Sequence, residues 1–300
     1  MATYNGRRWI EPQVDSILSQ RGVSVSLFIS DDGSTDGTLD YLRERADADP
    51  RVHVVAPRGG PPGVAANFLH LFSTHPLTAD RIVAFSDQDD IWRPDKLNRQ
   101  VEMMRASRAD AVSSNVVSFD SSGRQRLIVK SAPQRRWDYL FEAAGPGSTY
   151  VFTPSMHARL VQSLSTLDVS DVGVHDWFLY ALTRALGGKW VIDPIPTVEY
   201  RQHGDNVQGE HRGPDALRSR LAGLRSGFYR QQFILTAAAC LDLGAGLHDA
   251  EWNAELRRLA EDLRQEDLAA RLRVARRYRE IRRNPKEGLE LAVACVLHLW

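Results

Sequence analysis

The amino-acid sequence predicts an α/β fold followed by a helical appendage, and two observations carry this prediction. From the N-terminus to about residue 120, short β-rich segments alternate with segments of helical apolar spacing, which favours a sheet with much parallel pairing. From about Gly213 onward, the chain is helix-like and has no strand signal. We therefore expect a first domain at residues 1–212 and a helical C-terminal region at residues 213–300, which fits usual domain sizes.

Each element of the α/β part is predicted from its apolar spacing and its boundary residues. Val14, Ile17 and Leu18 have helical spacing just after the N-terminus. The run VSLFIS then leads into DDGSTDGT, where Gly, Ser and Asp mark a turn and a helix start. The remaining predicted strands are RVHVVA, Ile82–Phe85 and DAVSSNVVSFD, and the remaining predicted helices lie in LDYLRERA, in RGGPPGVAANFLHLF after its Gly/Pro loop, and in RPDKLNRQVEMMRAS.

The composition is that of an ordinary globular protein and excludes few functions. Lys plus Arg and Asp plus Glu balance at 38 each, so no general affinity for nucleic acid follows, and we expect no nucleic-acid partner. The 2 cysteines give neither a disulfide framework nor a zinc set. No apolar run reaches the ~18–20 residues of a membrane-spanning helix. These features favour a cytoplasmic location.

Three carboxylates, Asp87, Asp89 and Asp90, follow the predicted strand Ile82–Phe85 within four positions. Like charges this close repel one another, so ionising all of them is costly. Ligands of α/β sheets bind beyond the carboxyl ends of the strands, where Asp31 and Asp32 of the neighbouring predicted strand would also lie. We therefore expect one site rather than two.

A divalent cation such as Mg²⁺ or Mn²⁺ would compensate this crowded charge. Such hard ions take oxygen ligands and keep positions open for substrate phosphates. The alternative interpretation is a solvated turn before a helix, in which Asp95 is a plain first-turn acid. Asp31 and Asp32 likewise allow a second interpretation, in which they belong to a turn that caps the following helix and do not bind a ligand.

Five motifs occur in order along the chain: ATYNG, DDGSTDGT, SDQDDIW, HDWFLYAL and YRQHGDN. Together they resemble family 2 glycosyltransferases of the GT-A fold, closest to the bacterial rhamnosyltransferase-like branch, over roughly Met1 to Gln208. The resemblance implies a Rossmann-like mixed sheet and an enzyme that transfers a sugar from a nucleoside diphosphate.

The resemblance also implies roles for individual residues. Tyr4 matches the aromatic residue that packs on the nucleotide base, with Ala2 and Thr3 beside it. Asp32 matches the carboxylate that reads the base, and Asn67 lies where relatives approach the nucleotide.

The remaining matches concern the metal and the chemistry. Asp87 and Asp89 match the DxD pair, with Asp87 near the ribose and Asp89 on the metal under the diphosphate. His203 matches a third metal ligand of some relatives, and Asp176 matches the general base. The alternatives are a first-turn helix acid for Asp176 and a surface histidine for His203.

These residue types suit inverting glycosyl transfer. An aspartate can take the proton of the acceptor hydroxyl, and a Mg²⁺ or Mn²⁺ ion can neutralise charge on the leaving diphosphate. The branch resemblance favours a dTDP-rhamnose donor, with a UDP-sugar as the other choice. The acceptor would be a glycan or a lipid-linked glycan in bacterial surface-polysaccharide synthesis.

Two other functions stay open at this point. A non-catalytic sugar-nucleotide-binding subunit would need no base, although Asp176 is present. An aspartate-nucleophile phosphatase also has a strand followed by DxD, but such enzymes want Thr or Val where this chain has Ile91. The phosphatase reading also leaves ATYNG, HDW and RQHGDN unexplained.

Three segments depart from the family pattern or extend beyond it. Relatives begin with an apolar run before ATYNG, so we expect this chain to lack part of its first strand. The loop PRGGPPGVAANF is unusually rich in Pro and Gly. Between Arg271 and Lys286, 8 basic residues accompany a single acid, Glu280, and this cluster would suit peripheral contact with anionic lipid at the inner face of the plasma membrane.

Overall fold

The computed structural model describes residues 1–74, 80–203 and 226–300. Within this part of the chain, no helix has the length and apolar character that crossing a membrane requires. The predicted domain boundary after residue 212 lies outside the described residues and stays a prediction. The chain forms two compact units: unit 1 comprises Met1–Ser131, Ala144–Asp176 and Lys189–His203, and unit 2 comprises Ala132–Ala143, Trp177–Gly188 and the C-terminal segment that ends at Trp300.

A parallel three-stranded sheet holds the N-terminal part of unit 1. Its order is β1 (Ala2–Thr3), β2 (Leu27–Asp31) and β3 (Val52–Val54), with Ala2 opposite Ser30. Helices α1 (Ile10–Leu18) and α2 (Thr38–Ala48) follow β1 and β2 in the chain. The structure thus confirms the α/β class. Strand β1 comprises 2 residues, Ala2 and Thr3. The expectation that part of the first strand is missing stays a prediction.

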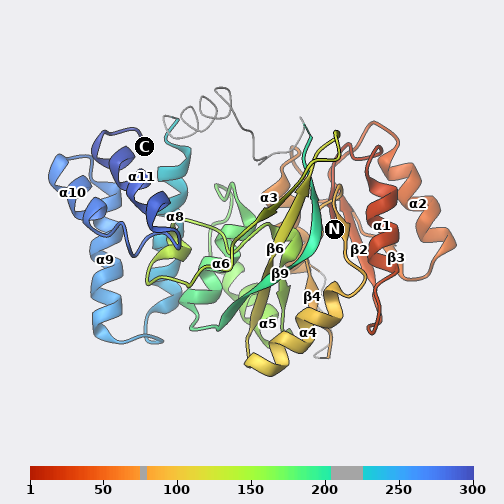
Figure 1. Cartoon of the computed structure of the whole chain (residues 1–300), viewed down its shortest axis with the longest axis horizontal. Coiled ribbons are helices and arrows are strands. Elements are labelled where there is room, and N and C mark those ends of the chain that lie inside the picture. Colours follow the sequence, from red (N-terminus) through yellow and green to blue (C-terminus); the bar gives the residue numbers. More distant parts are fainter. Residues whose placement is uncertain (75–79, 204–225) are drawn as a thin grey trace. The chain divides into compact units, whose positions relative to one another are not determined.

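A second sheet of unit 1 is mixed, as the GT-A resemblance implies. Strands β6 and β9 run parallel, whereas β4, β5, β7 and β8 pair antiparallel with their neighbours. Figure 1 shows β6 and β9 side by side. The sheet has the order β4-β8-β6-β9-β5 with β7 on β6, and its strands are β4 (Val83–Ala84), β5 (Ile91–Trp92), β6 (Ala111–Phe119), β7 (Gln125–Ile128), β8 (Val151–Phe152) and β9 (Trp190–Arg201).

Strand β9 was not predicted from the sequence, and its two prolines explain why. Pro194 and Pro196 lack the N–H that a sheet ladder needs and so argue against a central strand. The sheet accommodates them by a register shift between Ser114 and Val116 of β6, so that Asp193 and Val198 resume regular pairing on either side. An irregular strand therefore runs through the middle of this sheet.

The apolar core of unit 1 follows the predicted spacing of the first helix. Ile10, Val14 and Ile17 are 0%, 0% and 1% exposed, and they pack in one cluster with Ile29 of β2. Residues three or four apart share one face of a helix, which is why these side chains reach the sheet together. The other helices of this part are α3 (Val64–Thr74), α4 (Lys96–Ser107) and α5 (Pro154–Leu164).

Unit 2 is helical where the structure describes it, as the sequence of the tail predicts. Its aromatic core places Phe233 against Phe141, Trp177 and Trp300, with ring centroids 4.7, 5.4 and 5.0 Å away. In Figure 1 the C-terminal helices take the blue end of the colour scale. They are α8 (Phe228–Gly244), α9 (Ala250–Arg264), α10 (Leu268–Arg276) and α11 (Pro285–Val296), and the short helix η1 (Asp138–Leu140) and most of α6 (His175–Ala185) belong to the same unit.

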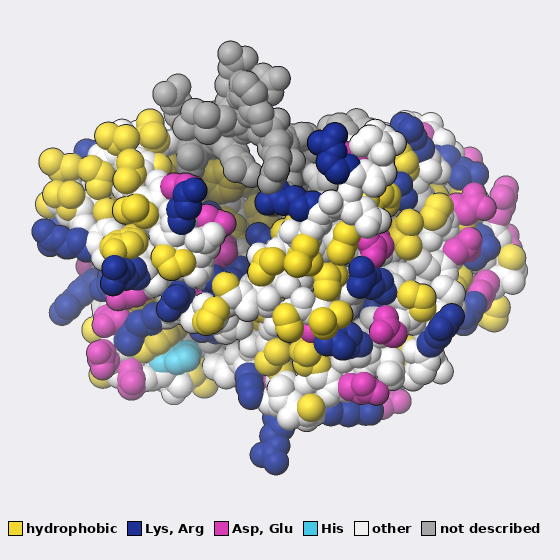
Figure 2. Space-filling model, viewed as in Figure 1, with side chains coloured by type: hydrophobic (Ala, Val, Ile, Leu, Met, Phe, Trp, Pro, Cys, Tyr) yellow, Lys and Arg dark blue, Asp and Glu magenta, His cyan; other side chains and the backbone are white. Residues whose placement is uncertain are grey.

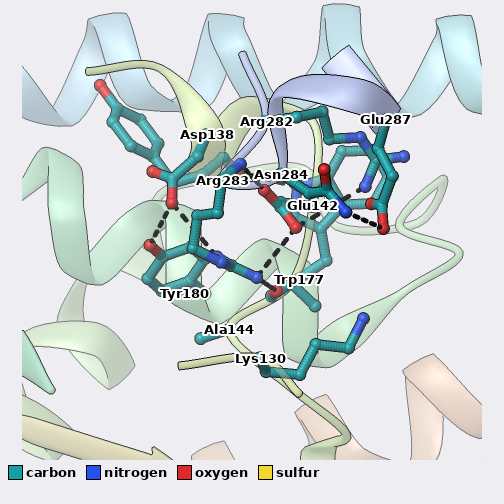
Figure 3. Close-up of polar contacts among 12 residues, drawn as sticks. Lys130, Asp138, Glu142, Ala144, Trp177, Tyr180, Arg282, Arg283, Asn284 and Glu287 are labelled. Carbon is teal, nitrogen blue, oxygen red and sulfur yellow. Dashed lines mark hydrogen bonds and ion pairs between the residues drawn. The ribbon is translucent and has the colours of Figure 1, made fainter. Parts of the chain in front are cut away.

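A buried ion network ties the last helices of unit 2 to η1. The Arg283 side chain is 3% exposed and lies 3.1 Å from Asp138 Oδ2 and 2.9 Å from Glu142 Oε2. Tyr180 of α6 donates its hydroxyl hydrogen to the same Asp138 oxygen at 3.1 Å. Figure 3 shows Arg283 between these acids. A buried charge is stable only when it is paired, so these residues depend on one another.

Candidate functional site

Two adjacent carboxylates end β2, and the structure gives them different surroundings. Asp31 accepts hydrogen bonds from the Thr3 hydroxyl at 2.7 Å and from the Ser34 N–H at 2.8 Å, so it fastens the turn that follows. Asp32 instead accepts from Arg58 Nη2 at 2.9 Å and from the Gly63 N–H. The Pro/Gly-rich loop is therefore tethered to the carboxylate that the family pattern assigns to the base.

The segment after β1 lies beside this turn. Ala2 and Thr3 are buried in the sheet, whereas the Tyr4 side chain is 44% exposed and available to a ligand. Asn67, at 2% exposure, uses its amide on Ser30: it accepts from the Ser30 hydroxyl at 2.5 Å and donates to the Ser30 carbonyl at 2.9 Å. Its predicted nucleotide contact stays a prediction, and its observed bonds fix α3 against β2.

The turn between β4 and β5 concentrates negative charge, as the sequence predicts. Burial and then the neighbouring Asp89 and Asp176 raise the pKa of Asp87 to about 8. Burial also raises the pKa of Asp90 well above its usual range, and Asp90 Oδ2 has no hydrogen-bond partner in the structure. The contribution of Asp176 to the pKa of Asp87 means that the two carboxylates lie near each other although 89 positions separate them along the chain.

The end of β9 brings a histidine to this turn. His203 Nε2 lies 2.9 Å from Asp89 Oδ2, and the imidazole stacks on Trp9 with ring centroids 5.0 Å apart. Arg201 donates from Nε to the Asp89 carbonyl at 2.8 Å and lies over the same tryptophan ring. Sequence reasoning identified His203 but missed Arg201, which ends the unpredicted strand β9, and Trp9, which lies at the start of α1.

Asp176 lies in the first turn of α6, next to a buried histidine. His175 stacks on Phe68 with ring centroids 3.9 Å apart, and burial lowers the pKa of His175 to about 3. Gly147 lets the backbone approach closely, because a Cβ there would lie 3.1 Å from His175 Nε2 and 3.2 Å from Asp176 Cβ. The position of Asp176 is thus restricted by the backbone of Gly147 and by its neighbour His175, which is held against Phe68.

Comparisons with known proteins agree with this geometry. Residues 1–167 match the model of the family described as glycosyl transferase family 2. The chain belongs to glycosyltransferase family 2. It is 39% identical over 245 residues to the dTDP-rhamnosyl transferase RfbG of Shigella flexneri. The aligned region covers 81% of this chain and 85% of that protein. It is also 29% identical to the succinoglycan biosynthesis protein ExoO of Rhizobium meliloti, over 65% of this chain and 57% of that protein.

Solved structures support the same fold. Residues 1–349 of TarS from S. aureus, in complex with UDP, superpose with a TM-score of 0.55 over 99% of this chain and 87% of that chain, at 12% identity. At such identity the likeness shows the fold alone, and it confirms the GT-A architecture together with the family match. Family membership makes the protein a glycosyltransferase and removes the phosphatase alternative.

The acidic turn of this glycosyltransferase suits a divalent cation. Asp90 Oδ2 is buried without a hydrogen-bond partner, and burial together with the charges of Asp89 and Asp176 raises the pKa of Asp87 to about 8. Oxygen and imidazole ligands such as Asp89 and His203 accept Mg²⁺ or Mn²⁺. Among the described residues, no group of three or more His, Cys, Asp or Glu side chains is arranged to hold a metal, so water and phosphate oxygens would have to complete the shell.

Proposed function

We propose that this protein is a metal-dependent, inverting glycosyltransferase. It would transfer a sugar, with rhamnose favoured, from dTDP or UDP to an acceptor hydroxyl in bacterial surface-polysaccharide synthesis. One observation carries the proposal: His203, which follows β9, lies with Nε2 2.9 Å from Asp89 Oδ2 in the acidic turn, 114 positions away along the chain. The similarity to a dTDP-rhamnosyl transferase supports the rhamnose donor, and the UDP complex of TarS supports a nucleoside diphosphate at this kind of site.

In this proposal, Asp176 is the general base. It takes the proton from the acceptor hydroxyl as the new glycosidic bond forms, while the nucleoside diphosphate leaves from the opposite face of the donor carbon. No covalent intermediate on the protein is needed, so the reaction inverts the anomeric configuration. The backbone of Gly147, close to Asp176, limits where its carboxylate can lie.

The donor would lie between β1 and the acidic turn. Tyr4 packs against the base beside Ala2 and Thr3, and Asp32 reads the base once it exchanges its bond to Arg58 for one to the ligand. Asp89 and His203 would hold the cation, and Asp87 would join them only after a shift, because the three side chains are not arranged around one point in the described structure. When bound, the cation supplies neutralisation of the charge that develops on the leaving diphosphate.

Calorimetric titration of dTDP and UDP, each with and without Mn²⁺, tests the donor site. We expect Mn²⁺-dependent binding of one nucleotide, and an Asp89→Asn variant to lose the Mn²⁺ dependence. Asp95→Asn is the matched control, because the Asp95 side chain makes no cap hydrogen bond at the start of α4. If the folded protein binds neither nucleotide, the proposed donor site is wrong.

An Asp176→Asn variant tests the base and also the non-catalytic alternative. Loss of general base catalysis lowers rates by roughly 10²–10⁴-fold. We therefore expect kcat to fall by about this factor while the dTDP dissociation constant changes less than about two-fold. A different result would favour a sugar-nucleotide-binding subunit: wild type and variant both bind dTDP normally, and neither transfers a sugar.

We also propose a cytoplasmic enzyme that contacts anionic lipid through its tail, where it would meet a lipid-linked acceptor. Much of the basic cluster is engaged elsewhere: Arg273 pairs with Asp262 at 2.7 Å, and Arg283 is buried. The contact would therefore rest on exposed Arg276, Arg279 and Lys286. Figure 2 shows apolar side chains gathered over the C-terminal helices, where the exposed residues are Leu268, Leu272, Leu289, Val293 and Leu297. Flotation with anionic vesicles that leaves all the protein in the dense fraction would contradict this contact.

A further inference from the structure

The middle residue of the DQD sequence makes an unusual contact. Gln88 lies between the two carboxylates of the acidic turn, and its side chain bonds to the backbone of Tyr4. The Tyr4 N–H donates to Gln88 Oε1 at 2.9 Å, and Gln88 Nε2 donates to the Tyr4 carbonyl at 3.0 Å. One carboxamide thus satisfies both main-chain groups of a residue 84 positions away, as a neighbouring strand would.

Gly6 shows that this contact shapes the chain around it. A Cβ at residue 6 would overlap the carboxamide of Gln88. Gly6 is not among the described glycines of positive φ, so its backbone does not itself require glycine. The close approach of Gln88 is what excludes a side chain there. On its other side, Gly6 donates its N–H to the Thr38 hydroxyl at 2.9 Å, so the segment cannot simply move away.

The two segments that Gln88 joins belong to different sheets. Tyr4 follows β1 of the three-stranded parallel sheet, whereas the acidic turn connects β4 and β5 of the mixed sheet. No backbone ladder is assigned between β1 and either of these strands among the described residues. The side chain of Gln88 therefore supplies a direct connection between the end of β1 and the carboxylates.

We propose that Gln88 is a positioning residue that fixes the distance between the nucleoside end and the diphosphate end of the donor site. The proposal rests on the proposed function, in which Tyr4 packs on the base and Asp89 lies under the diphosphate. A ligand that spans both segments benefits when they are already aligned, because ordering them on binding would cost free energy. A ligand that touches Tyr4 alone gains nothing from this alignment.

Titration of two ligands of different length tests the inference. We expect Gln88→Ala to weaken dTDP binding in the presence of Mn²⁺ by roughly ten-fold, the scale of two lost hydrogen bonds. Thymidine, which has no phosphate, should lose less than about two-fold, as measured by NMR titration. Gln88→Glu keeps an acceptor for the Tyr4 N–H but loses the donor to the Tyr4 carbonyl. We therefore expect this variant to bind dTDP more weakly than wild type as well. Gln125→Ala, on the exposed part of β7, is the control.

Gly6 provides the reciprocal experiment. Gly6→Ala should weaken dTDP binding in the same way, because the added methyl group displaces the Gln88 carboxamide. The double variant Gly6→Ala/Gln88→Ala should bind dTDP no worse than Gln88→Ala, since the clash has been removed. Coupled effects of this kind identify a shared contact.

Three results would overturn the inference in distinguishable ways. Equal losses of dTDP and thymidine binding in Gln88→Ala would mean that Gln88 does not align the two segments. Losses that add in the double variant would mean that Gly6 and Gln88 act separately. A folded wild type that binds neither dTDP nor UDP would remove the proposed function itself, and the inference with it.

Discussion

Burial sets the protonation of the residue next to the proposed base. His175 stacks on Phe68 and has no hydrogen-bond partner at Nε2, and burial lowers its pKa to about 3. The histidine is therefore neutral at physiological pH and places no positive charge beside Asp176. A neutral imidazole therefore does not itself lower the pKa of this carboxylate by charge attraction.

The first prediction concerns the pH dependence of stability. Between pH 6.5 and about 3, the unfolded chain protonates His175 and the folded chain does not, so stability falls as pH drops through this window. We expect the unfolding free energy of His175→Phe, relative to wild type, to rise by about 2 kcal/mol from pH 6.5 to pH 5. Urea unfolding at several pH values measures it. A pH-independent difference between His175→Phe and wild type would contradict the argument.

At the scale of single residues, the sequence indicates which side chains could take part in binding or catalysis, but it does not indicate which residues they contact in the fold. Asp87 and Asp89 stand out because carboxylates are crowded behind an apolar strand, and the structure does place them in an acidic turn. Arg58 on Asp32 and Gln88 on Tyr4 were not predicted. Their partners lie 26 and 84 positions away, and no local spacing reveals such pairs.

Helix α6 carries the second prediction. Gly147 contacts its first turn so closely that an added methyl group would move Asp176 by a few tenths of an ångström. Misplacement on this scale costs rate rather than affinity, because reacting atoms must be aligned. We expect Gly147→Ala to lower kcat roughly ten-fold with little change in the donor KM.

Initial rates over a range of donor concentrations measure this split. Ser121→Ala, an exposed change in the turn between β6 and β7, serves as the control. A rise in the donor KM at unchanged kcat would mean that Gly147 acts on donor binding and not on the base.

Elements with clean periodicity were predictable, and elements shaped by long-range pairing were not. Val14 and Ile17 of α1 are buried as expected and Leu18 is partly buried. Strands β3 and β6 lie within the predicted runs, and β2 ends one residue beyond its run, at Asp31. Strand β9 contains two prolines, so local rules argue against it. Its parallel pairing with β6 outweighs that local preference and carries Arg201 to the acidic turn.

At the scale of the molecule, the third prediction concerns the ion network of unit 2. Arg283→Met would remove the nearer of the two guanidinium groups that pair with the fully buried Asp138, Arg184 being the other, and would also break the 2.9 Å pair with Glu142. Breaking a buried pair costs about 3–5 kcal/mol. We expect a loss of this size in the unfolding free energy, measured with urea. Arg283→Lys should lose most of the same stability, because an ammonium cannot reach Asp138, Glu142 and the Ala143 carbonyl together.

The exposed Arg276→Met is the matched control and should change stability by less than about 0.5 kcal/mol. Similar small losses for Arg276→Met and Arg283→Met would show that the network contributes little. Sequence reasoning saw only a basic cluster here. Composition cannot tell an arginine on the surface from one buried against acids earlier in the chain.

The Arg283 network also has a consequence for how the chain is made. Asp138 leaves the ribosome 145 residues before Arg283, the nearer and more deeply buried of its two arginine partners. At about 5–20 residues per second, this delay is roughly 7–30 s. During that time the N-terminal sheets can form, but the buried ion network around Asp138 lacks Arg283 and stays incomplete. The last part of the protein to be synthesised therefore completes the burial of a segment from its middle, and a nascent chain released early would keep that segment exposed to proteases.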